Sequence, residues 1–311
     1  MTSKEQVTFK GRHFEIAGEL YFPENFDAAK KYTALVVSHP GSSNLEQTSG
    51  LYAEKLAEKG FLALTFDATY QGRSGGEPRF LEDPAMRTED ISYAIDYLVT
   101  LPYVDEERIG AAGVCAGGGY TINAAKTERR IRAVAGIAAA NIGSTYREAQ
   151  GSDDGVIATL EQVAKQRTAQ ARGAEEAIVP WIPNSKEEAE AAGITEIDYL
   201  EAVDYYRTER GCSPHSPNKL LLTSMQLILG FDANANIEKL LTQPLQLIVG
   251  DIPGAFSSYR NGFEVYNRAA SKEKDLLVLH GVTHYDLYDQ PKAVDPAVEK
   301  LDEFFTKYLG K

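Results

Sequence analysis

The feature that most constrains the fold is a regular alternation of buried strands with amphipathic helices in the first 140 residues. Residues 32–38 and 61–66 form continuous apolar runs, which are typical of strands buried on both faces of a parallel sheet. Residues 49–59, between them, carry apolar side chains at helical spacing, and Gly60 supplies a stop. The same pattern predicts strands at 7–10, 13–22, 108–114 and 131–138 and helices at 86–99 and 116–125. Steps of this length predict right-handed βαβ units and a mostly parallel sheet flanked by helices, an α/β fold.

The alternation stops near Asn141 and resumes at Pro244. Residues 141–240 read as polar and helical, with 16 acidic and 9 basic side chains, which is over half of the net charge of −13. Strands are then predicted at 244–249 and 275–280, and helices at 263–270 and 296–308. We therefore expect an α/β core made of residues 1–140 and 241–311, which carries residues 141–240 as a helical cap insertion.

Composition removes several classes of protein. The excess of 45 acidic over 32 basic residues argues against a nucleic-acid partner, because such affinity comes largely from Lys and Arg. No apolar run approaches the ~20 residues of a membrane helix, and the polar N-terminus has no signal-peptide core. Two cysteines cannot form a disulfide framework or a cysteine-based metal cluster. We expect a cytoplasmic protein without a metal or cofactor.

The segment Gly113-Val-Cys115-Ala-Gly117 is the most informative motif. It lies between a predicted strand and a predicted helix, which is the context of a nucleophile elbow. Glycines two residues before and after the nucleophile fit because the sharp turn leaves no room for Cβ atoms. The helix N-terminus would favour a thiolate. We interpret Cys115 as the nucleophile; the alternative is a small buried cysteine that serves packing alone.

Two loops would complete this site. The loop that begins at His39 follows a buried strand, and we expect the backbone N–H groups of Gly41 and Ala116 to form an oxyanion hole. Alone, this loop reads as an ordinary β-to-α turn, and His39 as a residue that organises it. His284 follows the last predicted strand and is the expected base, whereas His280 is expected to pack.

The acid is expected just past the strand that ends at Val249. Asp251 is the only carboxylate before Glu264, and it would orient the imidazole of His284. An aspartate before Pro253 and Gly254 can equally initiate a turn. Asp286 would need an awkward bend to reach the same ring.

Aromatic side chains are frequent in the insertion, and they either line an acyl pocket or form the insertion's own small core. The candidates are Tyr146, Trp181, Tyr199, Tyr205 and Tyr206. The same surface could also support a homodimer.

Together these motifs resemble the dienelactone-hydrolase-related branch of the α/β-hydrolases. More narrowly, the chain is similar to uncharacterised bacterial hydrolases and fungal polyketide-transferase-like proteins. The resemblance rests on His39-Pro-Gly41, Phe66-Asp67, Gln71 to Arg79, Gly113 to Tyr120 and Thr283 to Asp289. It implies an α/β-hydrolase fold and a triad that includes Cys115 and His284. Relatives tend to place the acid where this chain has Gly254 and Ala255, and by analogy Glu46 is a candidate carboxylate near the cysteine.

The expected function is a cysteine-dependent hydrolase that acts on small-molecule esters, lactones or thioesters. A triad of Cys115, His284 and Asp251 would work through an acyl-enzyme. Two alternatives stay open: an acyl (polyketide-type) transferase on the same triad, and a non-catalytic ligand-binding protein on this fold.

Overall fold

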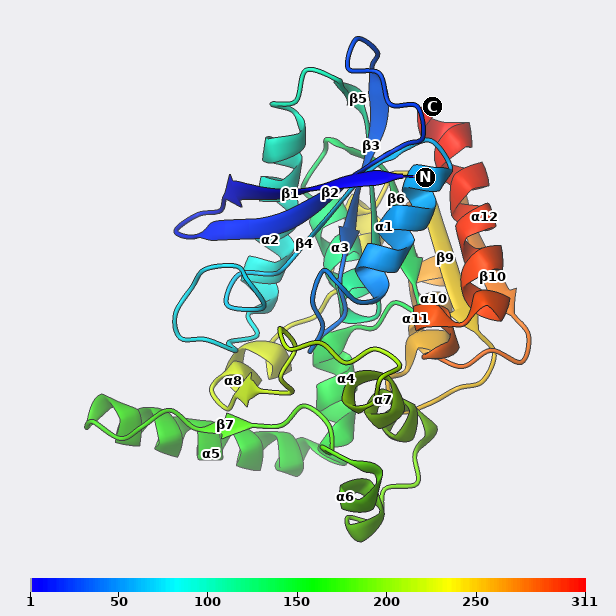
Figure 1. The fold of residues 1–311 in the computed structure, drawn as a ribbon. Coiled ribbons are helices and arrows are strands. Elements are labelled where there is room, and N and C mark those ends of the chain that lie inside the picture. Colours follow the sequence, from blue (N-terminus) through cyan, green and yellow to red (C-terminus); the bar gives the residue numbers. More distant parts are fainter. Residues whose placement is uncertain (1) are drawn as a thin grey trace.

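The computed structural model describes residues 2–311, which are built around one eight-stranded sheet (Figure 1). Its strand order is β1-β2-β4-β3-β5-β6-β9-β10. β1 pairs antiparallel with β2, and β2 with β4, whereas all the other pairs are parallel. This confirms the predicted mostly parallel sheet. The strands are β1 (Ser3–Lys10), β2 (Glu15–Phe22), β3 (Tyr32–Ser38), β4 (Leu62–Phe66), β5 (Val104–Val114), β6 (Ile131–Ile137), β9 (Leu245–Gly250) and β10 (Lys274–Leu279).

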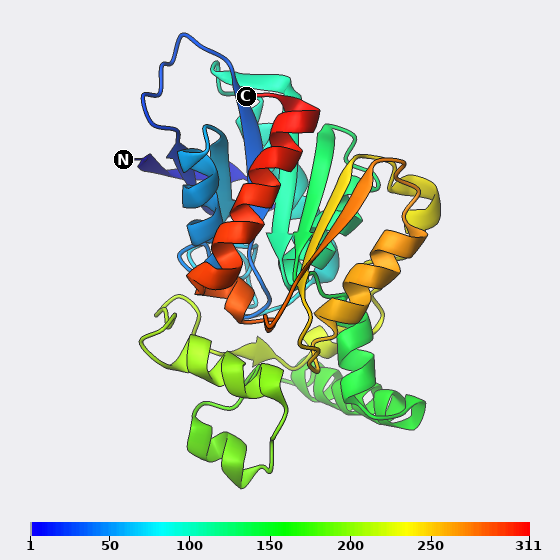
Figure 2. The same ribbon diagram turned by 90° about the vertical axis from the view of Figure 1, so that its right-hand side faces the viewer.

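Helices cover both faces of the sheet, which explains the continuous apolar runs of the central strands. Helices α1 (Thr48–Glu58) and α12 (Pro291–Leu309) pack together over one face, as Figure 2 shows. Helices α2 (Pro84–Leu98) and α3 (Ala116–Ala125) pack together over the other, and α10 (Ser258–Arg268) packs on β9 and β10. In β3, for example, every residue from Thr33 to Val37 is fully buried.

Most elements of the chain between β6 and β9 lie at the carboxyl ends of the parallel strands (Figures 1 and 2). The last helix of this stretch, residues 237–240, instead lies at the amino end of β9, where the carbonyl of Ile237 accepts the N–H of Ala270. The long helix α5 projects away from the sheet in both views. The elements are α4 (Ile142–Ala149), α5 (Asp153–Ala171), α6 (Lys186–Ala191), α7 (Ile197–Arg207), α8 (Ser224–Leu229) and α9 (Ile237–Leu240), with the paired strands β7 (Ile178–Val179) and β8 (Leu220–Leu221). Within residues 2–311, no helix is both long enough and apolar enough to cross a membrane.

Two helices begin five residues earlier than predicted. Helix α12 starts at Pro291, not at Pro296, because burial of Ala293 and Val294 extends the apolar face past the internal proline. Helix α10 starts at Ser258, not at Phe263. Its interior Gly262 weakened the helical pattern, but a Cβ atom there would lie 2.6 Å from Val249, so the glycine allows the helix to approach the sheet.

Candidate active site

The predicted sharp turn around Cys115 is present between the end of β5 and the start of α3. Cys115 has φ 55° and ψ −125°, a strained conformation for a residue with a Cβ atom. A Cβ atom on Gly113 would lie 2.3 Å from the carbonyl oxygen of Gly117, and one on Gly117 would lie 2.4 Å from that of Ser38. The chain can therefore make this turn only with glycine at both positions.

The thiol of Cys115 is almost wholly buried, and three neighbouring groups act to lower its pKa. They are the side chains of His284 and Tyr288 and the backbone N–H of Ala116. Burial is the largest influence on the pKa of Cys115 and raises it. The charge of His284 and the other two groups outweigh burial, so the pKa of the thiol falls below its ordinary value. The site therefore favours the thiolate.

His284 lies on the loop after β10, and both of its ring nitrogens have partners. Nδ1 is 2.9 Å from the hydroxyl oxygen of Ser258, and Nε2 is 3.3 Å from that of Tyr288. The ring of Phe256 packs edge-on against the imidazole at 5.5 Å. These contacts fix the imidazole beside the thiol without a carboxylate at Nδ1.

Asp251, the expected acid, is not brought to His284, and that prediction is wrong. Its carboxylate accepts the backbone N–H of Gly281 at 2.7 Å and lies 2.5 Å from Nδ1 of His280. The reason is the backbone: the N–H of Asp251 is bonded to the carbonyl of Leu279, which holds the residue beside the edge strand. His280 is exposed and does not pack in the core, which corrects a second expectation.

Glu46 also lies away from the thiol. It pairs with Arg73 and accepts a hydrogen bond from Ser213 at 2.9 Å, and His215 lies 3.2 Å from it. Ser213 and His215 belong to the insertion and Arg73 to the core. Glu46 therefore ties these two parts of the chain together.

Buried polar groups hold the loop that is expected to form the oxyanion hole. His39 is buried, and its Nε2 accepts the backbone N–H of Ala68 at 3.1 Å. Arg87 donates to the carbonyl oxygens of His39 and Pro40 at 2.6 and 3.2 Å. Burial and the charge of Arg87 hold the pKa of His39 well below its usual range. His39 thus organises the loop, as expected, while the role of Arg87 was missed because it comes from α2, far along the chain.

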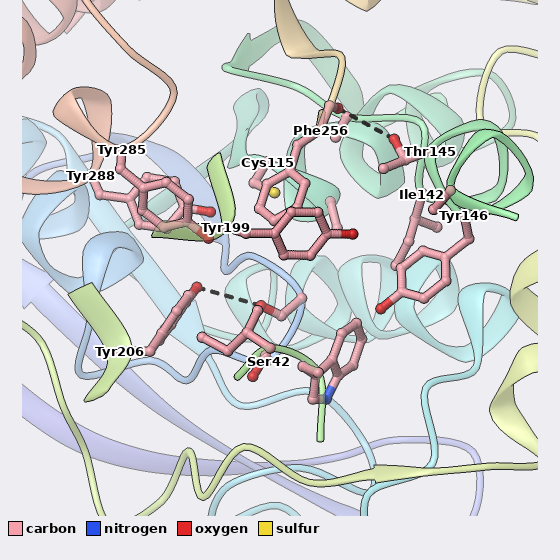
Figure 3. A pocket seen from close by; sticks show the side chains of 16 residues that line it. Ser42, Cys115, Ile142, Thr145, Tyr146, Tyr199, Tyr206, Phe256, Tyr285 and Tyr288 are labelled. Atoms are coloured by element: carbon pink, nitrogen blue, oxygen red, sulfur yellow. Dashed lines mark hydrogen bonds between the residues drawn. The ribbon is translucent and has the colours of Figure 1, made fainter. Parts of the chain in front are cut away.

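A pocket with about 700 Å³ of empty space, including its open mouth, leads to the thiol. Figure 3 shows its aromatic side chains around the sulfur of Cys115. Among the lining residues that the structure describes, none carries a charged side chain. They are Gly41, Ser42, Cys115, Ala116, Ala140, Ile142, Thr145, Tyr146, Ala149, Trp181, Ile182, Tyr199, Tyr206, Phe256, Tyr285 and Tyr288.

Four of the five aromatic candidates of the insertion line this pocket: Tyr146, Trp181, Tyr199 and Tyr206. Tyr205 does not, and that prediction is wrong. Its ring lies behind the wall, 4.9 Å from the ring of Tyr206 and 5.1 Å from that of Tyr288. Consecutive residues of an α-helix point in directions about 100° apart, so α7 can direct only one of these two tyrosines into the pocket.

The core supplies three aromatic lining residues that the sequence did not indicate: Phe256, Tyr285 and Tyr288. The last two follow His284 at distances of one and four residues, and this spacing was the available signal. Within residues 2–311, no group of three or more His, Cys, Asp or Glu side chains is placed to hold a metal ion.

Comparison with known proteins agrees with the fold. A protein YcjY from Escherichia coli is 43% identical over 94% of this chain and 94% of its own length. The crystal structure of PA2218 from Pseudomonas aeruginosa superposes with a TM-score of 0.88 at 32% identity, over 99% of this chain and 94% of that one. A thiohydrolase, apmlB from Arthrinium phaeospermum, is 33% identical over 47% of this chain and 48% of its own.

The family model described as PET hydrolase-like matches residues 3–179, more than half of the chain. Solved α/β-hydrolases superpose on this chain and so share its fold. The chain therefore belongs to the PET hydrolase-like family and has the α/β-hydrolase fold.

Proposed function

We propose that the protein is a cysteine-dependent hydrolase that cleaves esters and thioesters of uncharged acyl groups. The observation that carries this proposal is the environment of Cys115. Its thiol stands on a sharp strand-to-helix turn beside a buried histidine that lowers the pKa of the thiol, and the described residues that line the adjoining pocket carry no charged side chain. The thiohydrolase among the relatives adds support for thioesters.

The reaction would follow from the positions of these groups. The Cys115 thiolate attacks the acyl carbon, and the carbonyl electrons move onto the oxygen, which the N–H groups of Ala116 and Gly41 would hold. The tetrahedral adduct collapses, and the leaving oxygen or sulfur takes the Nε2 proton of His284. Neutral His284 then removes a proton from a water molecule, whose attack on the acyl-enzyme releases the acid and restores the thiolate.

The wall of the pocket limits the acyl group. Tyrosines and Trp181 offer ring faces and isolated hydroxyls, and none of the lining residues described can neutralise a carboxylate or an ammonium group. Burying an unpaired charge there would be costly. We therefore expect uncharged aliphatic or aromatic acyl groups, and esters or thioesters in preference to the less reactive amides.

The test compares hydrolysis of p-nitrophenyl esters and acyl-thioesters by the wild type, Cys115→Ala and Cys212→Ser. Cys212 is the matched control because it is exposed and outside the pocket. We expect Cys115→Ala to lose turnover and Cys212→Ser to keep it. Full activity in Cys115→Ala would contradict the proposal. Saturable binding of these compounds with no Cys115-dependent turnover of any of them would also contradict it.

A further inference from the structure

The turn formed by residues 254–257, between β9 and α10, brings two side chains to the imidazole of His284. The ring of Phe256 packs edge-on against the imidazole at 5.5 Å, and the hydroxyl oxygen of Ser258, the first residue of α10, lies 2.9 Å from Nδ1. Ser257, between them, has φ 60°, an unfavourable conformation for a residue with a Cβ atom. Such a residue keeps this conformation only when the surrounding structure holds it there.

The insertion holds this turn through three hydrogen bonds. Asp198 on α7 accepts the backbone N–H of Phe256 at 2.7 Å, and Glu196, at the start of the same helix, accepts that of Ala255 at 3.2 Å. The hydroxyl of Thr145 on α4 donates to the carbonyl oxygen of Phe256 at 3.3 Å, as Figure 3 shows. Both backbone polar groups of Phe256 are therefore bonded to side chains of the insertion, which lie 58 and 111 residues away along the chain.

Asp198 is the buried member of this set, and the turn leaves space for its carboxylate. It is 1% exposed, and its Oδ1 has no hydrogen-bond partner among the described residues. A Cβ atom on Gly254 would lie 2.2 Å from that oxygen, so the carboxylate lies directly against the backbone of the turn. Burying a carboxylate with an unpaired oxygen costs free energy. Departures of this kind are expected mainly at functional or strained sites.

We propose that Asp198 is a positioning residue, which holds the turn so that the imidazole of His284 stays beside the thiol. This inference rests on the proposed function and gives the insertion a second role besides forming the wall of the pocket. Helix α7 carries Tyr199 and Tyr206 of the pocket lining as well as Asp198. Movement of this helix away from the core would therefore open the pocket and release the imidazole together.

Removing Asp198 has two possible effects on the thiol of Cys115, and they have opposite signs. Loss of a nearby negative charge alone would favour the thiolate and lower the pKa of Cys115. Release of the turn would let the imidazole of His284 move away from the sulfur, and the pKa of Cys115 would rise, because the charge of His284 lowers it. A raised pKa of the thiol therefore reports the position of the imidazole, which a purely structural contact would not change.

The experiment measures the rate at which iodoacetamide alkylates Cys115 as a function of pH. It uses a Cys212→Ser background, so that only one thiol reacts, and compares the parent with Asp198→Ala. This substitution removes the acceptor of the Phe256 N–H. We expect the midpoint to rise by about one half to one pH unit, which corresponds to an alkylation rate about three- to tenfold lower below the midpoint.

Two further variants separate the hydrogen bond from charge and from general damage to α7. Asp198→Asn keeps an oxygen that can accept the N–H of Phe256 but carries no charge, so its midpoint should not rise. Asp204→Ala removes a carboxylate of the same helix that bonds to Lys186 and Arg210 and not to the turn, so it should keep the parent midpoint.

A midpoint in Asp198→Ala that equals or falls below that of the parent would overturn the proposal. An equal rise in Asp198→Asn or in Asp204→Ala would overturn it as well. If Asp198→Ala does not fold, Gly254→Ala tests the same contact, because its Cβ atom would displace the carboxylate. The midpoint should then rise in Gly254→Ala, and an unchanged midpoint there would count against the proposal.

Alkylation needs no substrate, so its outcome is separate from that of the proposed function. A raised midpoint in Asp198→Ala, together with no turnover of any ester or thioester by the parent, would contradict the hydrolase and leave the positioning role of Asp198 standing. Turnover by the parent with no change of midpoint would do the reverse.

Discussion

The hydroxyl oxygen of Ser258 lies 2.9 Å from Nδ1 of His284, at the first residue of α10. This is the position from which a carboxylate would orient the imidazole in a complete triad. A neutral hydroxyl can fix the orientation and tautomer of the ring but adds no charge to stabilise an imidazolium. Orientation by Ser258 and charge from the thiolate therefore divide the work of a triad acid.

Replacing Ser258 by Ala should lower kcat/KM for an ester by about five- to tenfold, because one neutral hydrogen bond contributes about 1 kcal/mol. The matched control is Asp251→Asn, which alters the carboxylate that binds His280 and not His284. We expect the control to stay within about twofold of the wild type. Steady-state kinetics on one p-nitrophenyl ester decide between the two. A larger loss of kcat/KM in Asp251→Asn than in Ser258→Ala would contradict this prediction and support Asp251 as the acid.

The elbow should not tolerate a Cβ atom at Gly117. Gly117→Ala would place that atom 2.4 and 2.5 Å from the carbonyl oxygens of Ser38 and His39, so the backbone must shift. We expect a loss of about 1–3 kcal/mol in the free energy of unfolding, together with a fall in activity as Cys115 moves. Gly230→Ala is the control, since its nearest neighbour would lie at 3.5 Å. Urea unfolding followed by circular dichroism measures both; equal stabilities would contradict the steric argument.

The sheet and the elbow could be predicted because they depend on local patterns. A strand buried on both faces must be continuously apolar, as residues 33–37 are, and the turn at Cys115 requires the two flanking glycines. The partners of His284 could not be predicted in this way. Ser258 and Tyr288 contact the imidazole from helices before and after it in the chain. Neither residue stands in a sequence motif that would indicate contact with a histidine.

The failure at Asp251 has a specific physical origin. Its position after a buried strand is that expected of a triad acid. However, its backbone N–H is bonded to the carbonyl of Leu279, which continues the pairing of β9 with β10 and keeps the side chain beside the edge strand. The aromatic residues show the same limit. Tyr205 and Tyr206 are neighbours in sequence, and only the packing of α7 on the core decides that Tyr206 enters the pocket.

Trp181 should limit the size of the acyl group. Its ring lies 3.2 Å from where a Cβ atom on Gly41 would stand and packs edge-on against Tyr146 at 6.2 Å. Trp181→Ala removes this wall, so the kcat/KM of a long or branched acyl ester relative to a short one should rise about tenfold. Ile178→Ala is the control, an exposed apolar residue on β7 outside the pocket lining. An unchanged ratio in Trp181→Ala would place the acyl chain elsewhere.

Asp198 on α7 should make stability depend on pH. It is 1% exposed, accepts the backbone N–H of Phe256 at 2.7 Å, and its Oδ1 has no hydrogen-bond partner among the described residues. Burial raises the pKa of Asp198 to about 6. The folded state therefore holds this proton more tightly than the unfolded state. The resulting stability is fully present below the ordinary pKa of aspartate and is lost as pH rises through about 6.

Asp198→Asn removes this titration, so the drop in unfolding free energy between pH 4 and pH 8 should shrink by up to about 3 kcal/mol. Asp204→Asn is the control on the same helix. Its hydrogen bond with Lys186, and further bonding and charge from Arg210, hold the pKa of Asp204 below its ordinary value. This partly exposed carboxylate adds stability only above the ordinary pKa of aspartate, so its loss cannot reduce the drop at high pH. Urea titrations of both variants at the two pH values measure the difference, and an undiminished drop in Asp198→Asn would show that this carboxyl is already ionised at pH 4.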